Sequence, residues 1–253
     1  MRQTVDVNSD MGEGFGAWAF AGDVDARLMP LVSSINLAAG FHAGDPATID
    51  RVTLLAQEHG VGIGAHPGFR DLVGFGRRHI DASAEELVCD VLYQLGAVRA
   101  LVERRGARLQ HVKLHGALYM HAARDEAFAR ALVDALDEAD ADLPILTMAG
   151  SVLDQVASER GHPAVRELYA DRLYGDDGQI VFTRDVGSLQ PEAVVAKIEQ
   201  ACAEGTVQTT SGASVPIVFD SICIHSDTPG AVALATAVRA ALDRVGVDVR
   251  TFA

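Results

Sequence analysis

Segments with the pattern of a β-strand alternate with segments of helical pattern along the whole chain. The predicted strands are residues 4–8, 34–39, 61–65, 111–114, 144–148, 165–169, 217–224 and 247–252. The predicted helices between them are residues 25–33, 45–59, 83–104, 125–139, 150–160, 191–204 and 228–245. This order is typical of a parallel sheet whose strands are joined by crossover helices. With about seven or eight such units, closure into a barrel is favoured over an open sheet.

Two segments interrupt the alternation. Residues 69–80 form a long loop rich in Gly and Arg, and residues 206–215 are predicted to form a two-stranded ribbon around Ser211-Gly212. No Pro/Ser-rich linker, charge block or internal repeat divides the chain. Because β/α barrels of roughly 250 residues are routinely one domain, we expect residues 1–253 to form a single β/α-barrel domain.

The charge balance disfavours several classes of partner. The formal net charge of −14 repels nucleic-acid phosphates and anionic membrane surfaces, so we expect neither as a partner. No apolar run reaches the roughly 18 residues of a membrane span, and the first residues do not resemble an apolar leader, so a cytoplasmic protein is expected. Cys89, Cys202 and Cys223 have no metal-binding spacing and are expected to be reduced and structural.

A short polar cluster lies at or just after the end of most predicted strands. These clusters are Asn8-Ser9-Asp10, residues 42–45, His66-Pro67-Gly68, Lys113-Leu114-His115, Glu167, Asp171-Arg172 and His225-Ser226-Asp227. A β/α protein gathers the carboxyl ends of its parallel strands at one face. We therefore expect these residues, which are far apart in the sequence, to converge on one small volume.

Many of the polar residues are also predicted to point into the barrel. Side chains alternate along a strand, so Asp6, Asn8 and Asp10 share the face opposite Val5 and Val7. Three further polar sets share a face in the same way: Asn36 and His42; His111, Lys113 and His115; and Ser221, Cys223, His225 and Asp227. An interior lined by such groups is costly to bury if they are unpaired. We favour a functional pocket over the alternative, a polar network that only fixes the fold.

The lysines are informative because there are only two of them, Lys113 and Lys197, among 21 basic residues. Arg is used everywhere else, and an ammonium group differs chemically from a guanidinium group. Lys113 lies inside a polar cluster and is therefore predicted to act in the site. Lys197 lies in a helical segment and is expected to be solvated.

The polar clusters belong to longer motifs. These are NSDMGE at residues 8–13, NLAAGFHAGD at 36–45, GAHP at 64–67, GFGRR at 74–78, HVKLHGALY at 111–119, ELYADRLY at 167–174 and HSDTP at 225–229. Together they span nearly the whole chain and resemble the motifs of the LamB/YcsF family. The resemblance implies an irregular (β/α) barrel with about seven parallel strands, of the glycoside hydrolase/deacetylase type.

The sequence departs from the family pattern at four positions. Ala39 stands where the family usually has Cys, so no essential thiol acts there. Leu114, Met120 and Ser226 stand where the family has Pro, Asn and Gly, and none of these changes removes an ionisable group.

The resemblance also implies a function. The family supplies the A subunit of the prokaryotic ATP-dependent 5-oxoprolinase, which cleaves the lactam 5-oxo-L-proline to L-glutamate. It therefore implies 5-oxoproline as substrate, ATP with Mg²⁺ as cofactor, and subunits B and C as partners; a homo-oligomer is left open. The sequence has no G-x-x-x-x-G-K-[ST] motif, so we do not expect this chain alone to bind the nucleotide.

Opening a lactam needs a nucleophile, an activated carbonyl and stabilisation of an oxyanion. The predicted catalytic residues are Asp10, His66, Lys113, His115 and Glu167. Asp10 is the candidate general base, and Lys113 is the candidate cation for the developing oxyanion or a phosphate. His66 and His115 are candidate proton donors or shuttles. Glu167 is a candidate to hold the ring nitrogen or to orient a histidine.

The predicted substrate-binding residues are His42, Asp45, Arg77, Arg172, His225 and Asp227. The arginines, with Arg78, are candidates for the substrate carboxylate or a phosphate. Asp45 is equally a helix cap, and Arg77-Arg78 alone would be a solvated pair in most proteins. Tyr119 is expected to pack rather than to line the pocket. Four further histidines are expected at the surface: His59, His79, His121 and His162.

A metal site is the main alternative. It would use imidazole and carboxylate ligands suited to Zn or Mn, drawn from His42, His66, His115, His225, Asp10 and Asp227. The spacing is not a compact signature such as H-E-x-x-H, so no metal ligand is assigned. The corresponding function is a metal-dependent amidohydrolase or carbohydrate deacetylase acting without ATP, which a stoichiometric transition metal would support. A third hypothesis is a non-enzymatic scaffold that holds 5-oxoproline for its partners.

Overall fold

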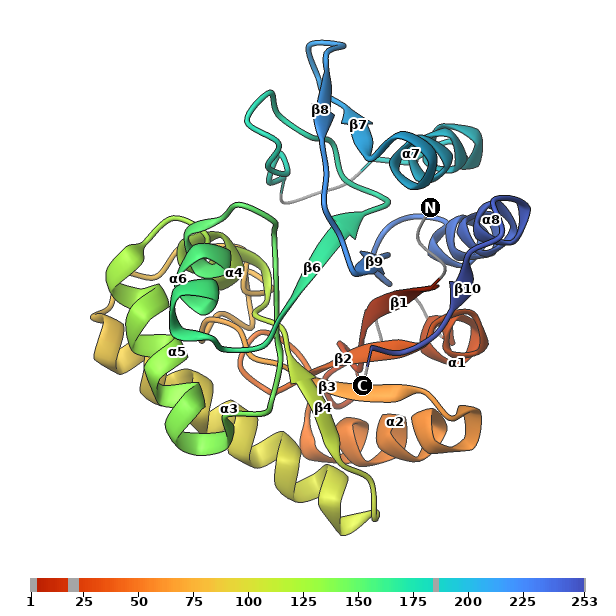
Figure 1. The fold of residues 1–253 in the computed structure, drawn as a ribbon. Helices are drawn as coiled ribbons and strands as arrows, with labels where there is room; N and C mark the ends of the chain where they lie inside the picture. The colour runs from red at the N-terminus through yellow and green to blue at the C-terminus, as the bar shows by residue number, and fades with distance from the viewer. Residues whose placement is uncertain (1–3, 18–22, 184–186, 253) are drawn as a thin grey trace.

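Seven parallel strands in the described part of the chain close into a barrel, and helices pack around its outside (Figure 1). The structure is a computed structural model that describes residues 4–17, 23–183 and 187–252. The strands follow the order β1-β2-β3-β4-β5-β6-β9, and β9 pairs with β1 to complete the ring. The predicted irregular (β/α) barrel is therefore confirmed.

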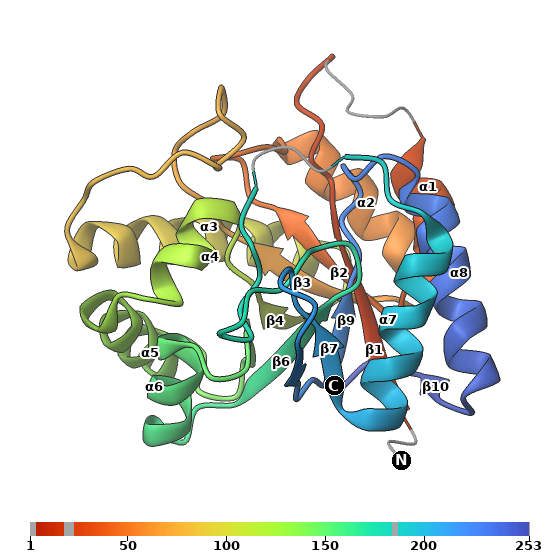
Figure 2. The same cartoon turned by 90° about the horizontal axis from the view of Figure 1, so that it is seen from above.

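The barrel strands are short. Their bounds are β1 Thr4–Met11, β2 Ser34–Ala38, β3 Gly62–His66, β4 Leu109–Val112, β5 Ile145–Thr147, β6 Ala164–Tyr169 and β9 Ser221–Cys223. Strand β1 is longer than predicted, because it continues through the polar cluster to Met11. Strand β9 covers only part of the predicted residues 217–224. In Figure 2 both chain termini lie at the lower end of the barrel, and the loops after β1 and β3 extend from the opposite end.

Three further strands lie outside the closed ring. The predicted ribbon is confirmed as an antiparallel hairpin of β7 (Thr206–Gln208) and β8 (Ser214–Pro216), which stands out from the barrel beside α7 in Figure 1. The predicted last strand is reduced to β10 (Asp248–Val249), which pairs with the first two residues of β1. Strands from both ends of the chain thus lie side by side; the assignment of residues 1–253 to a single domain stays a prediction.

The helices begin where the sequence carries capping signals. They are α1 Val24–Leu28, the 3₁₀ helix η1 Met29–Leu31, α2 Pro46–His59, α3 Ala84–Arg104, α4 Gly116–Ala122, α5 Glu126–Asp140, α6 Val152–Arg160, α7 Pro191–Glu204 and α8 Ala231–Arg244. The Asp45 carboxylate accepts from the Ala47 and Thr48 amides at the start of α2, and Ser83 and Glu86 form the expected capping box of α3. Helix α4 was not predicted. No helix in the described ranges is long and apolar enough to cross a membrane.

A polar network fills the lower part of the barrel, as the alternation of side chains predicted. Asp6 accepts from Ser34 Oγ at 2.9 Å and from Ser221 Oγ. Asn36 donates to Asn8 Oδ1 at 2.8 Å, and its own carbonyl oxygen lies 2.7 Å from His111 Nε2. The apolar residues of the same strands face the helices and form the main core. The network is therefore both buried and hydrogen-bonded, which holds its desolvation cost down.

A small residue on β3 makes room for this network. A Cβ at Gly64 would lie 2.0 Å from Nε2 of His111, which is closer than any real side-chain contact. The His111 ring therefore occupies the space that a side chain at position 64 would take. Burial lowers the pKa of His111 to about 3, so the ring is neutral.

Two side chains expected at the surface are not solvated. His162 is buried, and its Nδ1 lies 2.7 Å from Asp137 Oδ1. Lys197 is half-buried on α7 and donates to the carbonyl oxygens of Ala170 and Arg172, just after β6. Both residues are polar groups on helices or at helix ends whose partners come from other segments, which a pattern within one segment cannot indicate.

Candidate active site

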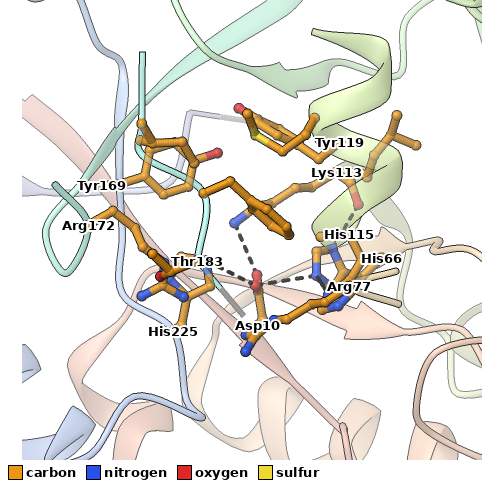
Figure 3. A pocket seen from close by; sticks show the side chains of 15 residues that line it. Asp10, His66, Arg77, Lys113, His115, Tyr119, Tyr169, Arg172, Thr183 and His225 are labelled. Carbon is orange, nitrogen blue, oxygen red and sulfur yellow. Dashed lines mark hydrogen bonds and ion pairs between the residues drawn. The ribbon is translucent and has the colours of Figure 1, made fainter. Parts of the chain in front are cut away.

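The carboxyl ends of the barrel strands surround a small cavity (Figure 3). Its polar and aromatic lining comprises Asp10, His66, Arg77, Lys113, His115, Tyr119, Tyr169, Arg172, Thr183 and His225. These residues come from segments spread over most of the chain, and the structure brings them together as the strand order requires. Tyr119 lines the cavity, so the expectation that it only packs is wrong.

Lys113 is at the centre of the site. Its Nζ lies 3.0 Å from Asp10 Oδ1, 3.1 Å from Glu167 Oε1 and 3.0 Å from Cys223 Sγ. Burial alone would lower the pKa of Lys113, but Asp10, Cys223 and Glu167 outweigh burial and raise it well above its ordinary value. The site therefore holds a charged ammonium between two carboxylates.

Asp10 stays ionised in the same setting. Burial alone would raise its pKa, but His66 and Lys113 outweigh burial and lower it well below the ordinary value. Its second oxygen, Oδ2, lies 3.3 Å from His66 Nε2 and 3.7 Å from His225 Nε2. One carboxylate thus faces an ammonium on one side and two imidazoles on the other.

His225 is held by a buried carboxylate that the sequence interpretation did not single out for this role. Its Nδ1 lies 2.9 Å from Asp171 Oδ1, and Asp171 also accepts from Thr228 Oγ1 at 2.6 Å. Burial alone would raise the pKa of Asp171, but His225 and Arg172 lower it below its ordinary value. The ionised Asp171 fixes the ring of His225 so that its Nε2 points toward Asp10.

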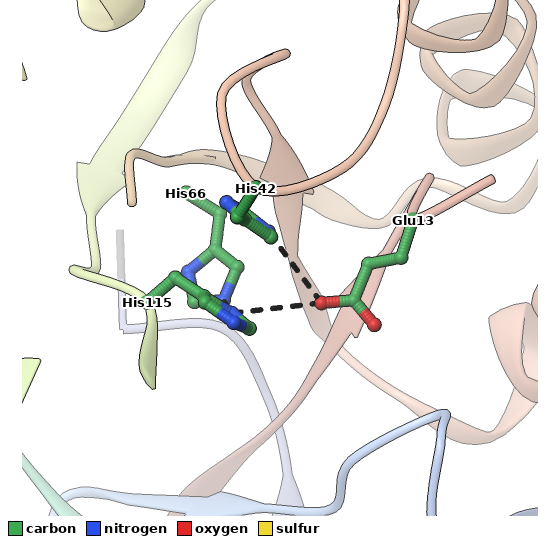
Figure 4. Close-up of side chains that lie close together, drawn as sticks. All are labelled: Glu13, His42, His66 and His115. Atoms are coloured by element: carbon green, nitrogen blue, oxygen red, sulfur yellow. Dashed lines mark hydrogen bonds and ion pairs between the residues drawn. The ribbon is translucent and has the colours of Figure 1, made fainter. Parts of the chain in front are cut away.

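Three histidines and Glu13 form a second group beside Asp10 (Figure 4). His66 Nε2 lies 2.9 Å from His115 Nδ1, and the His42 ring stacks on the His115 ring with 3.7 Å between centroids. The remaining ring nitrogens of His66 and His115 each lie 2.8 Å from a backbone carbonyl oxygen, of Lys113 and Phe75 respectively. These two contacts orient both rings.

The arginines differ in position. Arg77 and Arg172 line the cavity and are each paired with a carboxylate, Arg77 with Asp227 at 2.5 Å and Arg172 with Asp171 at 3.0 Å. Arg78 pairs with Asp71 instead, its side chain is 51% exposed, and it does not line the cavity. Only two of the three candidate arginines are therefore placed to meet a substrate there.

The remaining predicted residues lie behind the cavity wall or apart from it. His42 is fully buried behind His115, and Glu167 lies behind Lys113, to which it is bonded. Asp227 reaches the cavity through Arg77. Asp45 does not line the cavity; its two oxygens cap α2 and accept from the amide of Gly16. Of its two proposed roles, the structure shows the helix cap.

Several residues at the site were missed by the sequence interpretation. Tyr169 is on the same strand face as Glu167 and donates to it at 2.8 Å, so the alternation along β6 could have found it. Cys223 was expected to be only structural, but its sulfur contacts Lys113 inside the barrel. Glu13 gave no such signal, because it follows the end of β1 and Gly12, whose φ of 71° breaks the strand pattern.

The fold and the cavity define a class of protein: a closed parallel β/α barrel with a buried site of ionised groups at the carboxyl ends of its strands. Barrels of this kind place catalytic and binding residues at that face. The chain belongs to the LamB/YcsF family, whose model matches residues 5–253.

Individual relatives are similar over nearly their full length. The chain is 58% identical over 247 residues to the 5-oxoprolinase A subunit 2 of Pseudomonas syringae pv. tomato, covering 98% of each. It is 56% identical over 248 residues to the 5-oxoprolinase A subunit 1 of Pseudomonas putida, again covering 98% of each.

Solved structures show the same architecture. The lactam utilization protein of Thermus thermophilus superposes with a TM-score of 0.91 at 43% identity, covering 99% of this chain and 100% of that one. A family 4 carbohydrate esterase from Streptomyces lividans superposes with a TM-score of 0.51 at 9% identity, covering 99% and 93%. The second likeness shows a shared fold alone.

Proposed function

We propose that this chain is the A subunit of a multi-subunit 5-oxoprolinase, which hydrolyses the lactam of 5-oxo-L-proline to L-glutamate with hydrolysis of ATP. The names of the full-length relatives support this assignment. The observation that carries it is the buried Lys113–Asp10 pair at the cavity, because it offers a cation for a carbonyl oxygen beside a carboxylate for water.

The reaction breaks the amide bond of a five-membered ring. Water adds to the carbonyl carbon and loses a proton, negative charge develops on the carbonyl oxygen, and the ring nitrogen leaves as an amine after taking up a proton. The Lys113 ammonium is placed to stabilise the oxyanion, and such a group in a buried site contributes several kcal/mol to transition-state stabilisation. Asp10, which is ionised, is placed to accept the proton of the attacking water.

The remaining groups have roles around this pair. Glu167, bonded to both Lys113 and Tyr169, orients the ammonium. His225, fixed by Asp171, is the proton donor best placed for the ring nitrogen because its Nε2 faces Asp10 across the cavity wall. Arg77 and Arg172 would meet the substrate carboxylate, sharing it with their present acid partners.

ATP, with Mg²⁺, supplies the activation of the amide when it is bound. The sequence has no P-loop, so we propose that the partner subunits B and C complete the nucleotide site. The cytoplasmic location expected from the sequence stays a prediction.

The test is a coupled assay of glutamate release from 5-oxoproline and ATP by the chain assembled with subunits B and C. Asp10→Asn should abolish release. Asp6→Asn is the matched control, since Asp6 is on the same face of β1 but lies in the lower network, away from the cavity. We expect Asp6→Asn to lower stability while the folded fraction keeps its activity.

Three outcomes would contradict the proposal. If the wild-type assembly releases no glutamate while the chain alone removes acetyl groups from carbohydrates without ATP, the deacetylase alternative holds. If the chain binds 5-oxoproline in a calorimetric titration but Asp10→Asn leaves turnover by the assembly unchanged, the chain is a scaffold. If it neither binds nor turns over 5-oxoproline, the substrate is a different one.

A further inference from the structure

Four buried side chains beside Asp10 form a compact group of potential metal ligands (Figure 4). Glu13, His42, His66 and His115 follow four consecutive barrel strands, β1 to β4. Each offers one ligand atom, and these atoms all lie within 4.8 Å of one another. Two ligands on opposite sides of one ion with bonds of about 2.1 Å are about 4.2 Å apart, so only small side-chain shifts are needed.

Hydrogen bonds to the backbone fix which nitrogen of two rings faces this group. A carbonyl oxygen only accepts, so His66 Nδ1, 2.8 Å from Lys113 O, carries a proton. For the same reason His115 Nε2, 2.8 Å from Phe75 O, carries a proton. In the neutral rings, His66 Nε2 and His115 Nδ1 therefore direct lone pairs at each other across 2.9 Å. A cation between them removes this repulsion, and a backbone carbonyl behind each ring is the usual support of a metal-binding histidine.

His42 supplies an independent observation. Its side chain has no exposed surface, and neither ring nitrogen has a hydrogen-bond partner among the residues that the structure describes. An unpartnered buried polar group costs about 1–3 kcal/mol. Burial lowers the pKa of His42 well below its ordinary value, so the ring is in the neutral form that binds metals.

Glycines make room for these rings. A Cβ at Gly68 would lie 2.6 Å from His42 Nδ1, and a Cβ at Gly76 would lie 2.7 Å from both the His42 Cβ and the His115 Cδ2. The loop after β3 therefore packs its backbone against the two rings, in a space that no side chain could share.

Glu13 places a carboxylate where the local charge is already negative. Its Oε1 lies 3.7 Å from His42 Nε2 and 3.6 Å from His115 Nδ1, and its other oxygen meets Ser226 Oγ at 3.4 Å. Burial, followed by Asp227 and Asp10, raises its pKa well above the ordinary value. A divalent cation at this place would offset that repulsion.

We propose that His42, His66, His115 and Glu13 bind one divalent transition-metal ion. Three imidazoles and one carboxylate suit Zn²⁺, Mn²⁺ or Co²⁺ rather than Mg²⁺ or Ca²⁺, which prefer oxygen ligands. The ion would lie next to Asp10, whose Oδ2 is 3.3 Å from His66 Nε2. This assignment deepens the proposed function: it makes His66 and His115 ligands in the same cavity instead of proton carriers, and it does not by itself favour a deacetylase.

The test is metal binding by the isolated full chain after chelator treatment. Calorimetric titration with ZnCl₂ and MnCl₂, elemental analysis and the visible spectrum with Co²⁺ each report binding without any assay of activity. We expect one ion per chain and a metal-dependent rise in melting temperature. His42→Gln and Glu13→Gln should each weaken binding more than about tenfold, since even supporting residues of metal sites have effects of about 10–100-fold.

His162→Gln is the matched control, because His162 is a buried histidine that contacts Asp137 far from the cavity lining. It should bind the metal as the wild type does. Glu13→Gln guards against a variant that fails to fold, since it removes a buried charge close to two other carboxylates. Absence of stoichiometric binding by the wild type, or unchanged affinity in both ligand variants, would overturn the proposal. Glutamate release is measured on the assembled subunits, so its failure is a separate result.

Discussion

Replacing Lys113 by Met removes the ammonium from the centre of the site with little change in side-chain volume. Two buried carboxylates, Asp10 and Glu167, then lose their cation, and Cys223 loses its contact. Breaking a buried ion pair by removing one partner costs about 3–5 kcal/mol. We therefore expect the free energy of unfolding to fall by about that amount near neutral pH, and glutamate release by the assembled subunits to be lost.

The loss of stability should depend on pH. In the wild type the pKa of Asp10 is lowered on folding, so its contribution is present above the unfolded value and is lost only as pH falls through the low folded value. Without Lys113, burial should raise the pKa of Asp10 instead, and the folded variant takes up a proton. The penalty should then grow as pH rises from about 5 to about 7, by up to about 1.4 kcal/mol per pH unit for one proton.

Urea unfolding of the wild type and Lys113→Met at about pH 5, 6 and 7 measures both effects. Lys197→Met is the matched control, as it replaces the second lysine of the chain. Burial lowers the pKa of Lys197 to about 8, so it stays charged over this pH range and its penalty should be flat. A penalty for Lys113→Met below about 1 kcal/mol, or one independent of pH, would refute the account of the buried pair.

Two further changes test the packing and the orientation of the site. Gly64→Ala should destabilise the protein by about 1–3 kcal/mol because its Cβ would overlap the His111 ring, whereas Gly96→Ala, in an open position of α3, should stabilise it by up to about 1 kcal/mol; denaturant midpoints of equal sign would contradict this. Asp171→Asn should lower kcat of the assembled enzyme about tenfold or more with a smaller change in KM, because His225 loses the carboxylate that holds it. An unchanged kcat would mean that the orientation of His225 is not needed.

The barrel could be predicted from the sequence because crossover helices force neighbouring strands to be parallel, and the strand–helix alternation is regular. Helix α4 was not predicted, because it begins directly after Lys113-Leu114 and its N-cap, His115, makes no side-chain capping bond. The reduction of the last strand to β10 was also missed. Its pairing with β1 depends on how the two ends of the chain meet, which no local pattern records.

The site was predictable to the extent that strands impose a period of two. That period placed Asp10, Lys113 and His225 on inward faces, and the structure brings them to one cavity. It could not indicate Glu13, which lies past a glycine with positive φ, or the carbonyl of Phe75, which the loop of residues 69–80 carries to His115. Where a loop positions the group, the sequence shows that the residues exist but not which of them meet.

The two interpretations of the polar interior therefore apply to different depths of the same barrel. In the lower layer Asp6, Asn36 and His111 are bonded chiefly to one another and to strand neighbours, and this layer fixes the register of the strands. Asn8 links the layers, because it donates to Glu167 and accepts from Lys113 at 3.3 Å. A rigid lower network thus holds the ammonium of the upper layer in place, so loosening it should weaken the function of the cavity even where no residue of the cavity is changed.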